Sequence, residues 1–261
     1  MNTSRCTPRR SLDDARAAGL SDKVDTMLRV SRSLDAHGVL HIFTGSFVGW
    51  LHGASRLPRD VDVIAHPHAA NVAAYVAAPG RVPPVAIGDI VRELVGPGVD
   101  AQGLTDTNTG RFWRVEGVPV LAPEMLVLRK LLRARACLDP EVLRAAEREH
   151  GAQPPFMRVA SPDEDVRDAV EVMRANVDVM SVAGLPAMEG LPLAARVLCE
   201  LGPDHPAGRA ALAAVPLGHT LALLDVIPRS AGAWWGRTYT PAPSVVTRGA
   251  PVSRASRRRE A

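Results

Sequence analysis

The chain has 261 residues, 46% of them hydrophobic and 23% charged, with a formal net charge of +3 and a pI near 9.0. This length allows one or two domains, and no stretch reaches the ~18 uninterrupted apolar residues that a transmembrane helix needs. The polar N-terminus and three scattered cysteines (Cys6, Cys137 and Cys199) exclude a secretory signal, a disulfide framework and a paired-cysteine zinc site, so we expect a cytoplasmic protein with no membrane partner.

Helix and strand signals alternate over residues 21–150, after a polar lead at 1–20 that we expect to be mobile. Ser21 and Gly38 bracket an apolar stripe that predicts a helix, and Val39–Thr44 is a short β-rich run. Residues 112–121 alternate around Gly117, which predicts a hairpin, and Pro123 then opens a helix. The expected helices are 21–37, 47–52, 68–77, 88–95, 123–136 and 140–149, and the expected strands are 39–44, 60–65, 99–104, 112–115 and 118–121.

The pattern changes beyond a proline-rich boundary at 153–162. Residues 163–180, 191–201 and 208–226 favour helices, which predicts a helical domain over 160–228. Residues 229–261 are rich in Arg and Pro and predict a disordered tail that carries seven Arg and one acidic residue. The tail therefore holds a charge of +6 and leaves −3 for residues 1–228. We expect an α+β fold with α/β character: a small mixed sheet flanked by helices, followed by the helical domain.

Asp60 and Asp62 stand two residues apart at the start of the expected strand 60–65. Alternate strand residues point to one face of a sheet. Two carboxylates on one face can share divalent cations, and Mg²⁺ is typically held by one or two carboxylates together with substrate phosphates. A pair of such ions stabilises the entering and leaving oxygens of an in-line phosphoryl displacement. The alternative is an ordinary solvated turn before a strand.

Gly45-Ser46 separates the expected strand 39–44 from the helix 47–52. Glycine lets the backbone come close to a ligand, and Ser46 would stand at a helix N-terminus, where free N–H groups attract phosphate. A plain strand-to-helix turn is the alternative. Together with the two aspartates, a phosphate cradle here predicts nucleotide transfer from a triphosphate.

These residues resemble a known family when their order is taken together. Gly45-Ser46, His52-Gly53, Arg56 and the run DVDV at 60–63 look like the nucleotidyltransferase superfamily of the polymerase-β type. Within it, the chain resembles the AbiEii-like minimal nucleotidyltransferases, and the segment GVPVLAPE at 117–124, followed by Leu128, Lys130 and Leu131, extends this resemblance over about 40–140. The chain departs from the family pattern at Pro58, where the family usually has Thr.

The resemblance implies a role for each matching residue: nucleotide binding for Gly45, Ser46, Arg56 and Lys130, and Mg²⁺ binding for Asp60 and Asp62. Relatives commonly carry a third carboxylate on a later strand, as a metal ligand or general base. Asp100 is our candidate because it opens the expected strand 99–104, with Asp106 and Glu116 as rivals.

Simpler interpretations remain for four kinds of residue. Arg56 could pair with a surface carboxylate or orient the aspartates, and Lys130 could be a surface lysine whose stem lies along the protein. Asp139 matches an aspartate of the family, but we favour a helix N-cap because Pro140 follows it. The histidines lack metal-ligand spacing, so we expect no zinc site at His52, His66 or His68.

The sequence thus predicts an enzyme that moves a nucleoside monophosphate from an NTP to an acceptor hydroxyl with Mg²⁺, with two metal ions as a possible arrangement. The resemblance implies a toxin of a toxin–antitoxin pair that acts on RNA such as tRNA, with an antitoxin protein as partner. Two alternatives remain open: a transferase that modifies small molecules such as antibiotics, and a catalytically inactive nucleotide-binding or interaction protein of the same fold.

Overall fold

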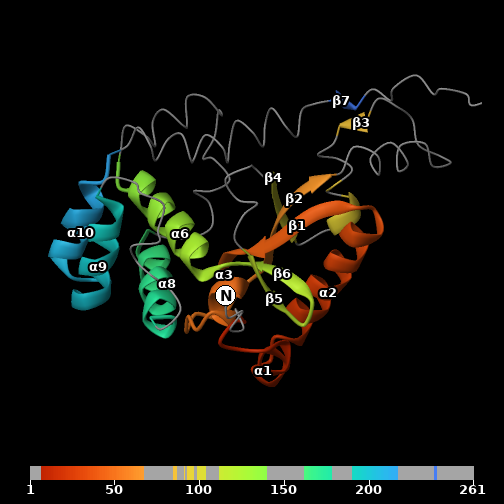
Figure 1. Cartoon of the computed structure of the whole chain (residues 1–261), viewed down its shortest axis with the longest axis horizontal. Helices are drawn as coiled ribbons and strands as arrows, with labels where there is room; N and C mark the ends of the chain where they lie inside the picture. The colour runs from red at the N-terminus through yellow and green to blue at the C-terminus, as the bar shows by residue number, and fades with distance from the viewer. Residues whose placement is uncertain are drawn as a thin grey trace, which may run out of the picture.

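The computed structural model describes residues 7–67, 85–86, 91, 93–96, 99–103, 112–139, 162–177, 190–216 and 238–239. These residues form an α+β fold, a mixed sheet with helices around it, as the sequence predicts (Figure 1). The strands are β1 (Val39–Thr44), β2 (Val61–Pro67), β3 (Val85–Ala86), β4 (Val99–Gly103), β5 (Phe112–Val115), β6 (Val118–Leu121) and β7 (Thr238–Tyr239). The helices are α1 (Leu12–Ala17), α2 (Ser21–Ala36), α3 (Gly45–Leu51), α6 (Pro123–Cys137), α8 (Pro162–Ala175), α9 (Leu191–Leu201) and α10 (Pro206–Ala213).

The main sheet has the strand order β4-β2-β1-β6-β5. β1 runs antiparallel to β2 and parallel to β6, and β2 runs parallel to β4. β5 and β6 form the expected hairpin, with Glu116 and Gly117 in its turn at positive φ angles of 48° and 88°. This topology places the C-terminal end of β1 beside the N-terminal ends of β2 and β4, so the 45–62 segment leaves and re-enters the sheet at one edge.

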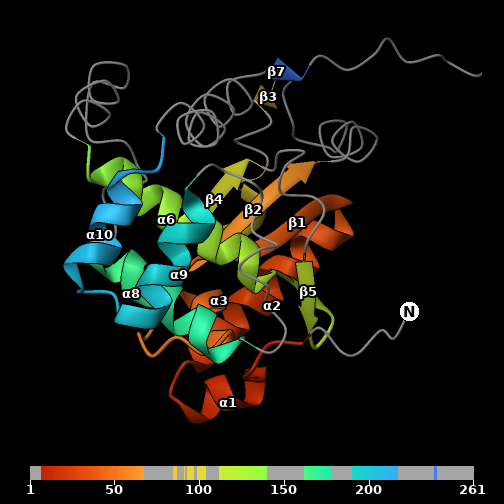
Figure 2. The same cartoon turned by 60° about the vertical axis from the view of Figure 1, so that its left-hand side comes forward.

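One hydrophobic cluster joins both parts of the chain. It runs from Leu12 through the sheet to Leu198, Leu212 and Val215. α6 packs closely on α8, α8 also contacts α3, and α9 packs on α10 (Figure 2). The sequence-predicted helical domain, as far as it is described, therefore shares its core with the sheet domain.

The N-terminal segment differs from the expected mobile lead. Ser11 caps α1 through a capping box, accepting a hydrogen bond from the Asp14 N–H while its own N–H donates to the Asp14 carboxylate. Leu12 and Ala15 are fully buried, and Arg10 binds the end of α3. The capping signal was present in the sequence, but the six-residue helix is too short to show an apolar periodicity.

Several other boundaries differ from the expected ones. Asp60 lies in a bend before β2 instead of opening that strand. α10 ends at Ala213, short of the expected helix 208–226. Thr238–Tyr239 of the expected disordered tail pairs with Val85–Ala86. The expected helices 68–77 and 140–149 lie outside the described residues. Among the helices that are described, none has the length and apolar character needed to cross a membrane.

Candidate functional site

Gly45 and Asp62 are in direct contact at the edge where β1 ends. Thr44 and Asp62 are register partners in the β1–β2 ladder, and Gly45 begins α3 with a φ of +74°. A Cβ atom on Gly45 would lie 1.6 Å from Asp62 Oδ2 and 2.4 Å from its Cγ. No larger residue fits at position 45 without displacing that carboxylate, and the positive φ also favours glycine. The Gly-Ser turn therefore lies directly against one of the two expected metal ligands, Asp62.

Asp100 occupies the position beside Asp62 on the next strand. The two residues are register partners in the parallel β2–β4 ladder. Among the rival carboxylates, Glu116 lies in the β5–β6 turn, toward the opposite end of the sheet, where its Oε1 accepts a hydrogen bond from the Leu12 N–H at 3.1 Å. Asp106 lies outside the described residues. The strand placement that favoured Asp100 is confirmed, and its catalytic role stays a prediction.

Asp60 and Ser46 are neighbours in sequence of the two residues in this contact. Asp60 is half-buried in the bend that precedes β2, and Ser46 is half-buried in the first turn of α3. α3 has only seven residues, so its dipole is a weak source of phosphate affinity compared with a long helix. Any anion binding here would depend mainly on free backbone N–H groups and on nearby basic side chains.

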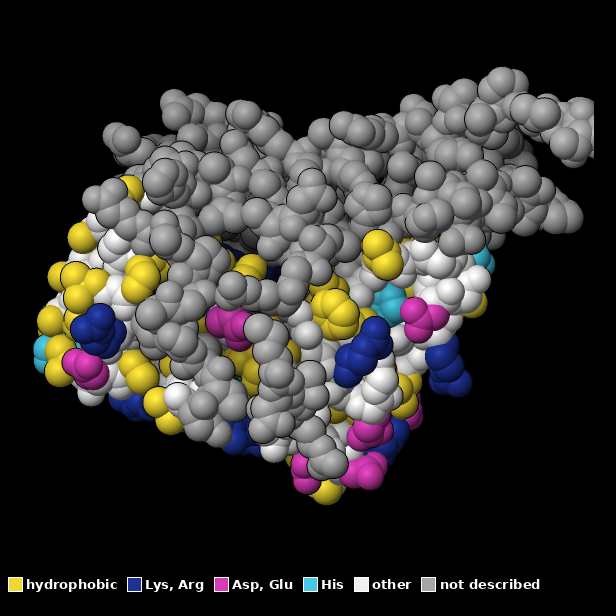
Figure 3. Space-filling view, viewed as in Figure 1, with side chains coloured by type: hydrophobic (Ala, Val, Ile, Leu, Met, Phe, Trp, Pro, Cys, Tyr) yellow, Lys and Arg dark blue, Asp and Glu magenta, His cyan; other side chains and the backbone are white. Residues whose placement is uncertain are grey.

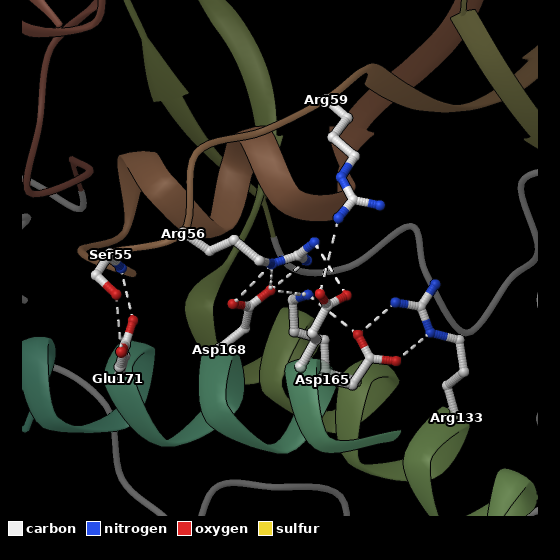
Figure 4. A network of polar contacts seen from close by, with 9 residues as sticks. Ser55, Arg56, Arg59, Arg133, Asp165, Asp168 and Glu171 are labelled. Atoms are coloured by element: carbon white, nitrogen blue, oxygen red, sulfur yellow. Dashed lines mark hydrogen bonds and ion pairs between the residues drawn. The ribbon is translucent and has the colours of Figure 1, made fainter. Parts of the chain in front are cut away.

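Arg56 and Lys130 meet on the same carboxylate, Asp168 of α8. Arg56 donates from Nε at 3.0 Å and from Nη2 at 2.5 Å to Asp168 Oδ2, and Lys130 Nζ donates to that oxygen at 2.7 Å (Figure 4). Lys130 is 3% exposed, which excludes the surface-lysine interpretation. The structure brings these two expected nucleotide-binding residues together, and both are engaged by α8. Their contact with a nucleotide stays a prediction.

A second carboxylate, Asp165, extends this network along α6. It accepts hydrogen bonds from Lys130 Nζ at 3.3 Å and from Arg133. Burial opposes the charge of Arg133, but the charge and hydrogen bonds of Asp165 outweigh it and raise the pKa of Arg133. Burial likewise works to raise the pKa of Asp168, yet the bonds and charges of Arg56 and Lys130 lower it overall. Both carboxylates are almost fully buried, and each is paired with two basic side chains.

Arg129 brings a further positive charge close to the candidate site. Burial and, to a smaller extent, the charge of Arg133 lower the pKa of its guanidinium to about 10, with a partial offset from the charge of Asp62. Asp62 thus lies in the field of two guanidinium groups from α6. The edge of the sheet combines carboxylates with nearby positive charge, a combination suited to a metal-bound anion.

His52 has a structural role in the fold. It is fully buried, its Nε2 is 2.7 Å from the carbonyl oxygen of Leu121, and its ring lies edge-on to Trp113. Burial lowers the pKa of His52 to about 4, with a partial offset from the Leu121 bond.

Among the side chains that the structure describes, no group of three or more His, Cys, Asp or Glu is suited to hold a metal. The side chain of Asp100 is not among those described. Asp139 follows α6, 3.8 Å from Arg135, and the helix it was expected to cap is not described.

A hollow of about 190 Å³ lies at the other end of β1 and shares no residue with the candidate site. Leu40, Ile42, Phe112 and Pro119 line it, together with Arg114. In Figure 3, hydrophobic side chains over this part of the sheet border basic and acidic ones, and acidic side chains gather at the lower tip, over α1.

Sequence reasoning missed Asp165, Asp168 and Arg133. The available signal was their position: Asp165 and Asp168 flank the apolar stripe of α8, which includes Val166 and Ala169, and a charge beside such a stripe needs a buried partner. Lys130, a cation surrounded by leucines, carried the complementary signal, but the family resemblance assigned it to nucleotide binding.

The arrangement suits metal-assisted chemistry on an anionic ligand. Carboxylate oxygens are the donors that Mg²⁺ prefers, and Asp62 presents one against a glycine turn where no side chain intervenes. The α6 guanidinium groups supply positive charge on the same side. Comparison of this chain with protein-family models, with curated proteins and with solved structures gives no match.

Proposed function

We propose that this chain is a Mg²⁺-dependent nucleotidyltransferase that moves a nucleoside monophosphate from an NTP to an acceptor hydroxyl. The observation that carries the proposal is the close approach of Gly45 to Asp62 beside the register partner Asp100. This approach leaves backbone, with no side chain, next to a carboxylate at the edge of the sheet, as binding of a triphosphate through a metal requires. The resemblance of the 45–63 segment to minimal nucleotidyltransferases points the same way.

In this proposal the acceptor oxygen attacks the α-phosphorus, and the bond between that phosphorus and the pyrophosphate oxygen breaks. Asp100 takes the proton of the acceptor hydroxyl, and the electron pair of the broken bond leaves with pyrophosphate. Asp60 and Asp62 hold Mg²⁺, which neutralises charge on the phosphates. Gly45 and Ser46 bind the triphosphate through their backbone N–H groups, and the positive charge of α6 attracts it. Catalysis rests on positioning and electrostatics.

The test is transfer of label from each α-labelled NTP to total RNA or to small hydroxylated acceptors, with and without Mg²⁺. Asp62→Asn keeps the shape of the side chain but removes its charge, and we expect a loss of transfer of at least ~100-fold with circular dichroism unchanged. Asp25→Asn is the matched control, an exposed aspartate on α2. Full transfer by Asp62→Asn would overturn the mechanism. Mg²⁺-dependent binding of NTP without any transfer would favour the inactive nucleotide-binding protein.

We propose RNA as the acceptor because basic charge is concentrated in one segment. The chain beyond Thr240 carries five Arg and one acidic residue. Truncation after Thr240 removes this charge and keeps β7. We expect weaker, less salt-dependent RNA association and unchanged NTP binding. Unchanged RNA association in filter-binding assays would reject the tail as the RNA contact, and label on small hydroxylated acceptors alone would identify a small-molecule transferase.

A further inference from the structure

The segment 52–59, which links α3 to the candidate metal ligands, is bound along α8 at every turn of that helix. Asn176 Nδ2 donates to the carbonyl oxygen of His52 at 2.7 Å. Ser55 donates to Glu171 from its N–H at 2.6 Å and from its hydroxyl at 2.9 Å. Arg56 then bonds to Asp168, and Arg59 lies near Glu164 (Figure 4). Residue numbers therefore rise along the segment while those of its partners on the helix fall. The segment therefore lies antiparallel to α8.

Close packing reinforces this alignment at Gly53. Its φ is +108°, and a Cβ atom there would lie 2.5 Å from the Cβ atom of Ala175. Arg59 is 3.9 Å from Glu164 at the other end of the segment, immediately before Asp60. The path of the chain from α3 to Asp60 is thus set by a helix more than 100 positions later in the sequence.

Asp168 is the centre of this contact. Its side chain is 3% exposed, and it accepts two bonds from Arg56 Nε and one from Arg56 Nη2 in a fork geometry. Lys130 Nζ fixes Asp168 Oδ2 from α6 at 2.7 Å. Asp168 therefore joins three elements: the segment 52–59, α6 and α8.

We propose that Asp168 is the positioning residue of the candidate site: by holding Arg56 against Lys130 it fixes the segment 52–59 and thereby sets Asp60 beside Asp62. The inference rests on the proposed function, since positioning has meaning only where those aspartates hold a metal. Groups that support metal ligands from behind commonly change metal affinity when they are removed. Asp168 acts through Arg56 and does not itself reach the reacting atoms.

Asp165 provides a matched control on the same helix. It is equally buried, at 1% exposure, and it also binds Lys130. Its other partner is Arg133 of α6, and it makes no hydrogen bond or ion pair within 4.0 Å to the described segment 52–59. Asp168→Asn and Asp165→Asn each remove one buried charge between α6 and α8, but only Asp168→Asn removes the charged hydrogen-bond partner of Arg56, which then keeps only its 3.7 Å ion pair with Glu164.

The experiment compares the full-length wild type with Asp168→Asn, Asp165→Asn and Arg56→Lys. Binding of Mn²⁺, as a probe for Mg²⁺, is followed by electron paramagnetic resonance, and hydrogen–deuterium exchange is measured in peptides covering 53–62. We expect Asp168→Asn to weaken Mn²⁺ binding about tenfold and to speed exchange in these peptides, while Asp165→Asn lowers the melting temperature without either change. Arg56→Lys keeps the charge but loses the fork, and it should reproduce the effect of Asp168→Asn even where that variant folds poorly.

The outcomes separate the two proposals. Equal Mn²⁺ affinity and equal exchange in Asp168→Asn and Asp165→Asn, with a wild type that binds Mn²⁺ and transfers label, overturn the positioning role alone. A wild type that neither binds Mn²⁺ nor transfers label overturns the proposed function and the positioning role with it. Recovery of Mn²⁺ affinity in Asp168→Glu, which restores the carboxylate, supports the positioning role.

Discussion

The segment between α3 and β2 is held from two sides by different chemistry. On one side α8 uses ion pairs, centred on the buried Asp168. On the other side the N-terminal segment uses Arg10, whose Nη1 donates to the carbonyl oxygens of Trp50 and Ala54, each at 2.8 Å. Arg10 also lies over the Trp50 ring at 4.4 Å from its centroid. One side is a buried charge network, and the other is a single cation at the C-terminal end of a short helix.

Because of this difference, we expect the loss of a contact to cost more free energy of unfolding on the α8 side than on the N-terminal side. A buried ion pair stabilises little relative to an apolar contact, but removing one partner is costly because the other charge stays buried. A half-exposed arginine that loses its carbonyl partners can still be hydrated, so its removal costs less. His52, at the start of the segment, is held by other elements as well: its carbonyl oxygen accepts a hydrogen bond from Asn176, and its ring bonds to Leu121 of β6.

Removal of Asp168 should have the largest effect on stability. Asp168→Ala leaves the buried Lys130 and the half-buried Arg56 without this partner, and we expect a loss of about 3–5 kcal/mol in the free energy of unfolding. Urea denaturation measures this directly. Glu171→Gln, which alters only the exposed pair with Ser55, should lose less than about 1 kcal/mol. Equal losses in the two variants would show that α8 holds the segment evenly along its length.

Acidification should have the second largest effect on stability, through protonation of His52. Its pKa is about 4 in the fold against 6.5 for a free histidine, so the unfolded chain binds more protons between these pH values. The contribution of neutral His52 to the free energy of unfolding is therefore fully present above about pH 6.5. That free energy falls by about 3 kcal/mol as the pH drops to 4. Burial also lowers the pKa of His41, which adds to the loss in the same direction.

Urea denaturation at a series of pH values between 7 and 4 checks this expectation. His52→Gln should be less stable than the wild type at pH 7, because the buried ring packs on Trp113, but its stability should fall less on acidification. Parallel pH curves for the two proteins would contradict the role given to His52.

The sequence predicted the elements whose local signals agree with their final packing. β1, the β5–β6 hairpin and α9 have the expected bounds, and α6 is longer by one residue. Alternation around Gly117 and the proline at the start of α6 were sufficient because these elements are determined by neighbouring residues. α1 was missed because its burial depends on distant contacts with α3 and Glu116.

The candidate site was predictable only in part, for the same reason. Residue types and order in the 45–62 segment suggested that Gly45 and Asp62 act together, and the antiparallel register of β1 and β2 brings them into contact. The pairing of Arg56 and Lys130 with Asp168 depends on how α8 packs on α6, and the local pattern of α8 indicates that Asp168 needs a buried partner without indicating which residue it is. The ion pairs between residues far apart in the sequence were therefore the part of the site that the sequence did not predict.

The smallest of these effects should come from the N-terminal side, at Arg10. Arg10→Met keeps an apolar stem over Trp50 but loses both carbonyl bonds and the cation–π contact, and we expect a loss of about 2 kcal/mol. The backbone bond from the Arg10 N–H to the Leu51 oxygen, 3.0 Å long, survives and limits the loss. Arg16→Met, which removes only a surface pair with Asp13, is the control and should change stability by less than about 0.5 kcal/mol. If Arg10→Met cost as much as Asp168→Ala, a half-exposed cation would hold the segment as firmly as the buried network, and the contrast between the two sides would fail.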